Sequence, residues 1–252
     1  MSQFMDQHLP NNFNVVRDYL LRIAGLPHPI QPIDVKHPDW PALGHAIDLR
    51  LRISLSSDFG TPVTAGIDAL SGHASLRGVP STPVRLALHR AGQDLLSMVR
   101  RHLARPTRLD EDTLCRLCFV AGYYEDIYRT GEIRRYSLLA SATPATTLEQ
   151  LIASVPPYAI EDIDQQMKLA VPPFAPFREL PSPARVCGPT FDGSGDIGGA
   201  DADFILGGLL LDCKAAIQPG GPERSRSPPR PEPRYISGWS STGHVPRPTE
   251  RR

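Results

Sequence analysis

The sequence predicts an α/β protein of the α+β type, with a helical N-terminal half, a small C-terminal β-hairpin and a disordered tail. Apolar residues recur every three or four positions through much of residues 1–155, which is the period of an amphipathic helix. Two short apolar runs, FIL and LLLDC, flank Gly207-Gly208 as the strands of a tight hairpin do. Residues 219–252 contain eight prolines and almost no aliphatic side chains, so they cannot bury a core.

Composition bounds the possible classes of protein. The chain has 252 residues, of which 40% are hydrophobic and 21% charged, and its formal net charge is zero. These values exclude a fully disordered chain and a large uniform electrostatic field. The start lacks a signal-peptide pattern and no apolar run is long enough to cross a bilayer, so we expect a cytoplasmic protein with no membrane partner. Four cysteines fit a reducing compartment.

Charge divides the chain near residue 218. Residues 1–218 have 20 basic and 24 acidic side chains, a net charge of −4, whereas residues 219–252 have seven Arg and three Glu, a net charge of +4. We therefore expect three parts: a mainly helical region 1–155, a region 156–218 with the hairpin 201–214, and a disordered Pro/Arg-rich tail 219–252. Such a tail can bind nucleic acid or a protein partner, but composition favours a solvated tail.

Helices are expected at five places in chain order. Each has a cap or stop signal beside an apolar stripe. They are 11–25, ending at Gly25; a helix that starts near Thr82-Pro83 and carries Val84, Leu88, Ala91, Leu95, Met98 and Leu103; about 110–130, ending at Gly131; a short helix in TTLEQLIASV; and YAIEDIDQQMKLA, before Pro172-Pro173. In the third of these, Cys115-x-x-Cys118 has no second cysteine pair nearby, so buried thiols are expected there and not a zinc site.

Residues 47–55, IDLRLRISL, fit two structures. Apolar and polar residues alternate without a break, as they do in a half-buried strand. Leu43, Ile47, Leu51 and Leu55 are also four apart, as on one face of a helix. The residues alone leave both possibilities open.

The hairpin brings charged residues together. With Gly207-Gly208 as its turn, Phe204 lies opposite Leu211, and Asp203 would lie opposite Asp212. Because side chains alternate along a strand, Asp201, Asp203, Asp212 and Lys214 share one face. Facing carboxylates repel each other, and a hard divalent cation is the natural compensation. Lys214 could then orient or deprotonate a water on that metal.

GGADADFIL followed by LLLDCKA resembles the PD-(D/E)xK nuclease superfamily, whose members cut nucleic acid with Mg²⁺ on an α/β, restriction-endonuclease-like core. The resemblance implies that Asp203 and Asp212 bind Mg²⁺ or Mn²⁺ together with the backbone carbonyl of Cys213, and that Lys214 is catalytic; Asp201 is an alternative first ligand. The wider likeness, over residues 40–217, is to a group of bacterial proteins of this superfamily. In them LGHAIDLRLR resembles an early helix, so the resemblance makes 47–55 a helix.

Glu125 lies on the apolar stripe that Leu114, Leu117, Cys118, Ala121 and Tyr128 form in the helix 110–130. An acid on a core face is costly unless it is paired or bound to metal. Members of the superfamily often supply one further acid from a helix before the hairpin, so Glu125 is a candidate metal ligand. A partly exposed Glu at the edge of the stripe, paired with an Arg, is the alternative.

The resemblance breaks after Lys214. The superfamily core continues with a helix and at least one more strand, whereas this chain has Ala215–Gln218 and then the Pro/Arg-rich tail. We therefore expect a member truncated or frameshifted after about residue 218, whose two-strand site lacks a sheet neighbour and a covering helix. The expected function is a Mg²⁺-dependent nuclease-like hydrolase of phosphodiester bonds, degenerate and with little or no activity. A non-enzymatic binding or regulatory protein with a structural hairpin is the alternative.

Overall fold

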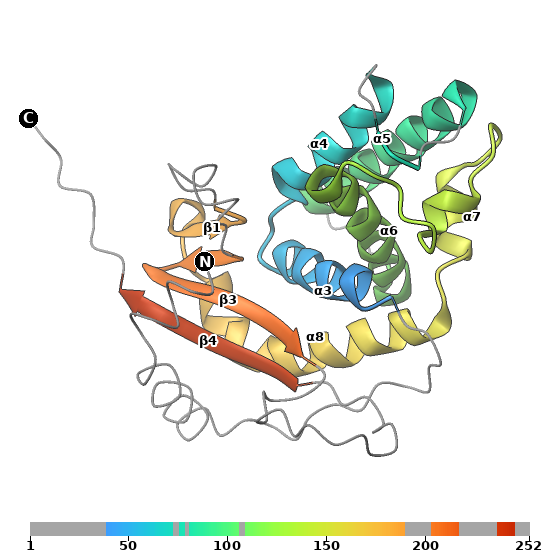
Figure 1. Cartoon of the computed structure of the whole chain (residues 1–252). Helices are drawn as coiled ribbons and strands as arrows, with labels where there is room; N and C mark the ends of the chain where they lie inside the picture. The colour runs from blue at the N-terminus through green and yellow to red at the C-terminus, as the bar shows by residue number, and fades with distance from the viewer. Residues whose placement is uncertain are drawn as a thin grey trace, which may run out of the picture.

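A computed structural model describes residues 39–72, 76–78, 81–105, 109–189, 203–216 and 236–244. The chain is mostly helical there, with one small antiparallel sheet beside the helices (Figure 1). The helix expected over 11–25 lies outside the described residues, as do Asp201 and the segments 217–235 and 245–252. Among the described helices none is long and apolar enough to cross a membrane.

The helices follow one another with short connections. In chain order they are α3 (Trp40–Ser54), α4 (Gly60–Ser71), α5 (Thr82–Ala104), α6 (Glu111–Thr130), the 3₁₀ turn η1 (Leu138–Ser141), α7 (Leu148–Ala153), α8 (Pro157–Arg178) and the 3₁₀ turn η2 (Ser182–Ala184). Helices were predicted where α5, α6 and α7 are found. At α7 the Thr147 side chain and Gln150 form the reciprocal capping box that starts a helix. No pattern predicted α4, whose glycines and β-branched residues lower helix propensity.

The segment with two possible periods is helical. α3 covers 47–54, and the Asp39 side chain caps it by accepting a hydrogen bond from the Ala42 amide at 3.2 Å. Leu43, Ile47 and Leu51 are buried as the helical period requires, but Leu49 and Ile53 are buried as well. α3 is enclosed on most of its sides, so apolar residues occur on more than one face of the helix. Some of them fall at alternate positions, which is why the sequence also fitted a strand.

α6 is the central helix of the core. Its residues from Leu114 to Ile127 are buried almost without interruption, and it packs against α3, α4 and α8. Asp110 caps its first turn at 2.7 Å from the Thr113 amide, and Gly131, with φ of 66°, ends it as predicted. Tyr128 was predicted to lie on the apolar stripe of this helix. Its side chain is 52% exposed, so that part of the prediction is wrong.

α8 continues past the expected stop. The helix ends at Arg178 and contains Pro172, Pro173 and Pro176 in its interior, although proline lacks the amide hydrogen that helix geometry uses. Burial of apolar side chains in its last turns favours the continuation of the helix past these prolines. Phe174 is 2% exposed and packs edge-to-face on Phe204, with ring centroids 5.8 Å apart, so the end of α8 covers the sheet.

The sheet has the strand order β1 (Arg185–Cys187), β2 (Phe204–Leu206), β3 (Leu209–Ala216) and β4 (Ile236–His244), with every neighbouring pair antiparallel. The predicted hairpin is confirmed: Phe204, Ile205 and Leu206 pair with Leu211, Leu210 and Leu209. Gly207 and Gly208 both have positive φ, 60° and 86°, which the tight turn requires and which side chains disfavour.

Two expectations about the surroundings of the hairpin need correction. The hairpin has a sheet neighbour on each side, because β1 pairs with β2 and β4 pairs with β3. α8 also covers it, through Phe174. β4 lies within 219–252, the segment for which composition predicted a disordered tail.

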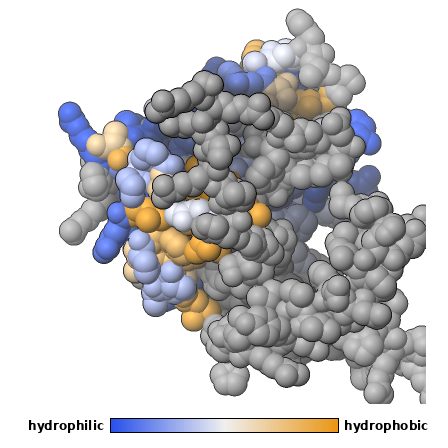
Figure 2. Space-filling view, turned by 90° about the vertical axis from the view of Figure 1, so that its left-hand side faces the viewer, coloured by the Kyte–Doolittle hydropathy of each residue, from blue (hydrophilic) through white to orange (hydrophobic). Residues whose placement is uncertain are grey.

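The two faces of the hairpin differ. Phe204, Leu206 and Leu211 are buried and join the hydrophobic core that α3–α8 form. The row Val186, Ile205 and Leu210 runs across β1, β2 and β3 on the opposite face, and Val186 is exposed. Figure 2, which views the molecule from the left-hand side of Figure 1, shows apolar and polar residues side by side on its described part. One core therefore joins the helices to the hairpin.

Two helical glycines provide a matched test of this packing. A Cβ on Gly66 would collide with the Tyr124 carbonyl oxygen of α6, whereas a Cβ on Gly44 of α3 would meet nothing within 4 Å. We expect Gly66→Ala to lower the free energy of unfolding by about 2 kcal/mol or more through overpacking. Gly44→Ala should raise it by about 0.5–1 kcal/mol, because alanine favours the helix. Urea denaturation measures both. Equal effects of the two substitutions would contradict the close contact of α4 with α6.

Candidate functional site

The residues of the predicted metal site lie along the hairpin. Asp212, Cys213 and Lys214 are in β3, where their Cα partners in β4 are Ser240, Trp239 and Gly238. Asp203 immediately precedes β2, and its carbonyl accepts a hydrogen bond from the Gly188 amide at 2.7 Å. Extending the β2–β3 register by one residue would place Asp203 opposite Asp212. Binding of an ion by the two carboxylates stays a prediction.

Glu125 lies inside the protein. Its side chain is 1% exposed, so a place at an exposed edge of the stripe is wrong. The pairing with an arginine that belonged to the same alternative is found: Oε1 accepts from Arg129 Nε at 2.8 Å and lies 2.7 Å from Nη2. His45 Nδ1 lies 3.5 Å from the same oxygen. Glu125 therefore joins α3 to α6.

Glu125 belongs to a larger group of buried and partly buried polar residues between α3 and α6. We call it the polar cluster, and its members are His45, Asp48, Arg52, Glu125 and Asp126. Sequence reasoning identified only Glu125 among them. A signal for the others was present, because positions 45, 48 and 52 fall on one helical face of a segment rich in apolar residues.

Arg52 links the polar cluster to the hairpin. Its side chain is 4% exposed; Nη2 lies 2.6 Å from Asp48 Oδ2, and Nη1 donates to the Phe59 carbonyl at 3.5 Å. Burial by itself would lower the Arg52 pKa, but the carboxylate of Asp48 and the charges of Glu125 and Asp203 outweigh it and raise that pKa. Acids of α3, α6 and the hairpin therefore act on one guanidinium.

The path of the chain after β1 also depends on Arg52. Gly188 has a φ of 60°, in the left-handed region that favours glycine. A Cβ on Gly188 would collide with the Arg52 guanidinium. The absence of a side chain at this position therefore lets the backbone lie against the buried charge.

Several carboxylate oxygens of the polar cluster lack hydrogen bonds. Within the described residues, Asp48 Oδ1, Glu125 Oε2 and Asp126 Oδ2 are buried and have no hydrogen-bond partner. Burial raises the Asp48 pKa to about 6, although Arg52 opposes the shift. Such oxygens are costly to bury and are suited to accept a proton or to bind a cation.

His45 bridges two carboxylates of α6. In addition to its contact with Glu125, its Nε2 lies 3.6 Å from Asp126 Oδ1, and Arg134 lies 3.1 Å from the same Asp126 oxygen. Burial by itself would lower the His45 pKa. The close carboxylate of Asp126 and the charge of Glu125 outweigh it, so the pKa is raised above 6.5.

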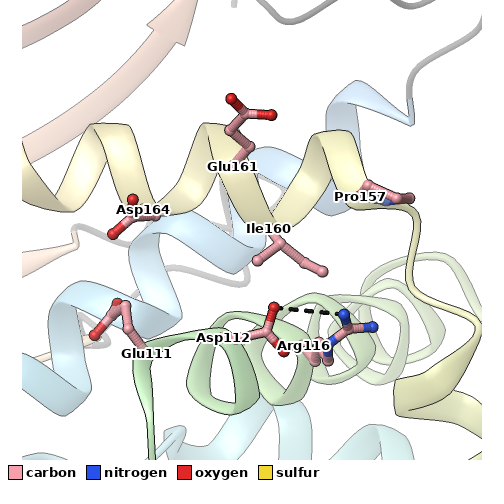
Figure 3. A pocket seen from close by; sticks show the side chains of 7 residues that line it. All are labelled: Glu111, Asp112, Arg116, Pro157, Ile160, Glu161 and Asp164. Atoms are coloured by element: carbon pink, nitrogen blue, oxygen red, sulfur yellow. Dashed lines mark hydrogen bonds and ion pairs between the residues drawn. The ribbon is translucent and has the colours of Figure 1, made fainter.

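Two other features, the cysteines of α6 and a pocket between α6 and α8, do not offer unpaired buried carboxylate oxygens like those of the polar cluster. Cys115 and Cys118 are buried free thiols, as expected, and burial raises the pKa of Cys118 to about 12, so it is not a reactive thiolate. A pocket of about 470 Å³ lies between the N-terminal parts of α6 and α8. Figure 3 shows the residues that line it: Glu111, Asp112, Arg116, Pro157, Ile160, Glu161 and Asp164. Asp112 is paired there with Arg116 at 2.6 Å, and Asp164 with Lys168 at 2.6 Å.

No grouping of three or more His, Cys, Asp or Glu side chains suited to a metal ion occurs in the described part of the chain. Comparisons with protein-family models, with curated proteins and with solved structures found no match to this chain.

The His45 bridge predicts how stability depends on pH. Its folded-state pKa is raised above the ordinary 6.5, so its stabilisation is complete below about pH 6.5 and is lost as pH rises through the folded-state pKa. We expect His45→Gln to destabilise the protein more at about pH 5.5 than at about pH 9. Denaturant melts at both values measure this. Asp126→Asn, which removes a charge that holds the proton, should shrink the difference; an equal cost of His45→Gln at both values would contradict the bridge.

Proposed function

We propose that this chain is a Mg²⁺- or Mn²⁺-dependent nuclease-like hydrolase that acts on phosphodiester bonds of nucleic acid and has a partial restriction-endonuclease-like core. The observation that carries the proposal is the β2–β3 hairpin: Asp212 and Lys214 are two residues apart on β3, and Asp203 immediately precedes β2.

The residues near the hairpin fit a divalent cation in chemistry. Mg²⁺ prefers oxygen ligands, and carboxylates and backbone carbonyls are the oxygens that Asp203, Asp212 and Cys213 offer. Glu125 Oε2 is a buried carboxylate oxygen without a hydrogen-bond partner among the described residues. We assign Asp203, Asp212, the Cys213 carbonyl and Glu125 as the proposed ligands.

Each residue then has a defined role. Bound Mg²⁺ supplies Lewis-acid polarisation of the phosphate and lowers the pKa of a water. Asp203 and Asp212 hold the cation and, through their negative charge, set its affinity. Lys214 stabilises the negative charge that develops on the phosphate, or orients the attacking water. Arg52 positions the acidic residues, because it is paired with Asp48 and lies in the field of Glu125 and Asp203.

A non-enzymatic binding or regulatory role is the second candidate, and one observation favours it. The Arg52 guanidinium is a buried internal cation that already interacts with acids of α3, α6 and the hairpin. A fixed cation of the protein can neutralise these carboxylates without a metal ion. In that case the hairpin is structural, and cleavage is weak or absent.

Metal-dependent stabilisation distinguishes the two functions. If Asp203 and Asp212 hold the ion, Mg²⁺ or Mn²⁺ at about 100 times its Kd should stabilise the folded chain by about 2.7 kcal/mol, and EDTA should reverse this. Asp212→Asn should abolish the effect because a ligand charge is lost. Lys214→Ala should keep it, because Lys214 is not a proposed ligand, and should lower whatever cleavage of labelled DNA or RNA the unchanged chain shows. Thermal melts and gel assays measure these quantities.

The matched control is Asp68→Asn on α4, an exposed carboxylate that contacts Gln93 at 3.4 Å. It changes the same chemical group away from the hairpin and should respond to Mg²⁺ as the unchanged chain does. A chain that gains no stability from either metal and cuts neither DNA nor RNA would refute the nuclease proposal and leave the binding role.

A further inference from the structure

Exposed aromatic and cationic side chains gather at the C-terminal end of α6, in the loop after it and at Arg77, which lies between α4 and α5 and pairs with Glu132. We call them the Tyr–Arg surface: Arg77, Tyr128, Arg129, Arg134, Arg135 and Tyr136. Tyr136 is 85% exposed and Tyr128 is 52% exposed, and both are among the most exposed large apolar side chains in the described residues. Neither ring contributes to the core, so folding does not explain their presence.

Backbone and side-chain contacts hold the three segments of this surface together. The Arg77 amide donates to the Gly131 carbonyl at 2.9 Å, and the Ile133 amide donates to the Arg77 carbonyl at 3.1 Å. The Arg77 guanidinium also donates to the Thr130 carbonyl at 3.2 Å. Arg134 ties the loop to α6 through Asp126. The surface is therefore formed by the fold and not by a free loop.

The charge exposed on this surface is mainly positive. Arg129 and Arg134 pair with the buried carboxylates of Glu125 and Asp126, and their own side chains are partly exposed, by 38% and 37%. Arg77 is 74% exposed and lies 3.4 Å from Glu132, the partly exposed acid of this region. Arg135 has no ion pair or hydrogen bond within the described part of the chain.

We infer that the Tyr–Arg surface binds single-stranded nucleic acid, with its phosphates on the arginines and its bases stacked on Tyr128 and Tyr136. Guanidinium groups bind phosphate oxygens in a bidentate manner, and base stacking on exposed aromatic rings is the usual device of single-strand binding. A duplex hides its base faces and would use only the arginines. This inference deepens the proposed function and rests on it in one respect: the bound strand is the substrate, and Arg129 joins its binding surface to Glu125.

The chain's own Arg-rich segment is not the occupant. Residues 219–252 have a net charge of +4 and would be repelled by the arginines. An acidic protein segment would satisfy the arginines but would leave Tyr136 without a stacking partner. Charge and aromatic exposure together therefore favour nucleic acid.

The test is fluorescence anisotropy of a labelled oligothymidine of about 20 nucleotides with the full chain in EDTA, which removes any dependence on metal. Tyr136→Ala should weaken binding about tenfold, and Tyr136→Phe, which keeps the ring, should restore it. Arg135→Ala should reduce the slope of log affinity against log salt by about 0.7, the value for one phosphate contact on a single strand. Arg90→Ala, at an exposed arginine of α5, is the matched control and should bind as the unchanged chain does.

Each outcome tests the binding of single-stranded nucleic acid by the Tyr–Arg surface separately from the proposed metal-dependent cleavage. Binding that is lost in Tyr136→Ala and restored in Tyr136→Phe supports the surface, even if neither metal produces cleavage, in which case only the nuclease proposal fails. Equal affinity of all variants overturns the inference, as does failure of the unchanged chain to bind the oligonucleotide. Binding of polyglutamate in preference to the oligonucleotide would instead assign the surface to an acidic protein partner. Circular dichroism of each variant confirms that it is folded.

Discussion

The buried ion pair of Arg52 with Asp48 is the interaction on which the arrangement of this molecule depends. A guanidinium that is 4% exposed must be compensated, because a lone buried charge costs several kcal/mol. Asp48, one turn earlier in α3, pairs with it at 2.6 Å, and the charges of Glu125 on α6 and Asp203 beside β2 also raise its pKa. A Cβ at position 188 would collide with the same guanidinium. One side chain thus lies close to α3 and to the chain after β1.

The apolar contacts set the framework in which these charges can be buried. α3 and α6 cross closely, and Gly122 allows the approach, since a Cβ there would lie 3.0 Å from the Ala42 carbonyl oxygen and 3.2 Å from the His45 Cβ. This proximity brings His45 within reach of both Glu125 and Asp126. The polar cluster is therefore a consequence of close backbone packing, and the packing is in turn stabilised by the charge pairing.

Local signals in the sequence predicted the fold well where a single residue type decides the backbone. Gly131 and Gly207-Gly208 ended α6 and turned the hairpin as expected, because positive φ leaves few alternatives to glycine. Prediction failed where tertiary burial overrides a local rule: Pro172 should have stopped α8, but burial of Phe174 favours its continuation. Glu125 was found from its place on an apolar stripe. His45, Asp48 and Arg52 were missed because the same segment also fitted a strand, in which positions 45 and 52 would lie on opposite faces.

The prolines of α8 make its two ends mechanically different. Each proline in the helix interior leaves the carbonyl four residues earlier without its usual donor, which here concerns Lys168, Leu169 and Pro172. The last turns reach the sheet chiefly through the packing of Phe174 and Phe177 on the core. Main-chain hydrogen bonds therefore contribute less at the sheet end of α8 than a proline-free helix would supply, and the joint between this helix and the strands depends on side-chain packing.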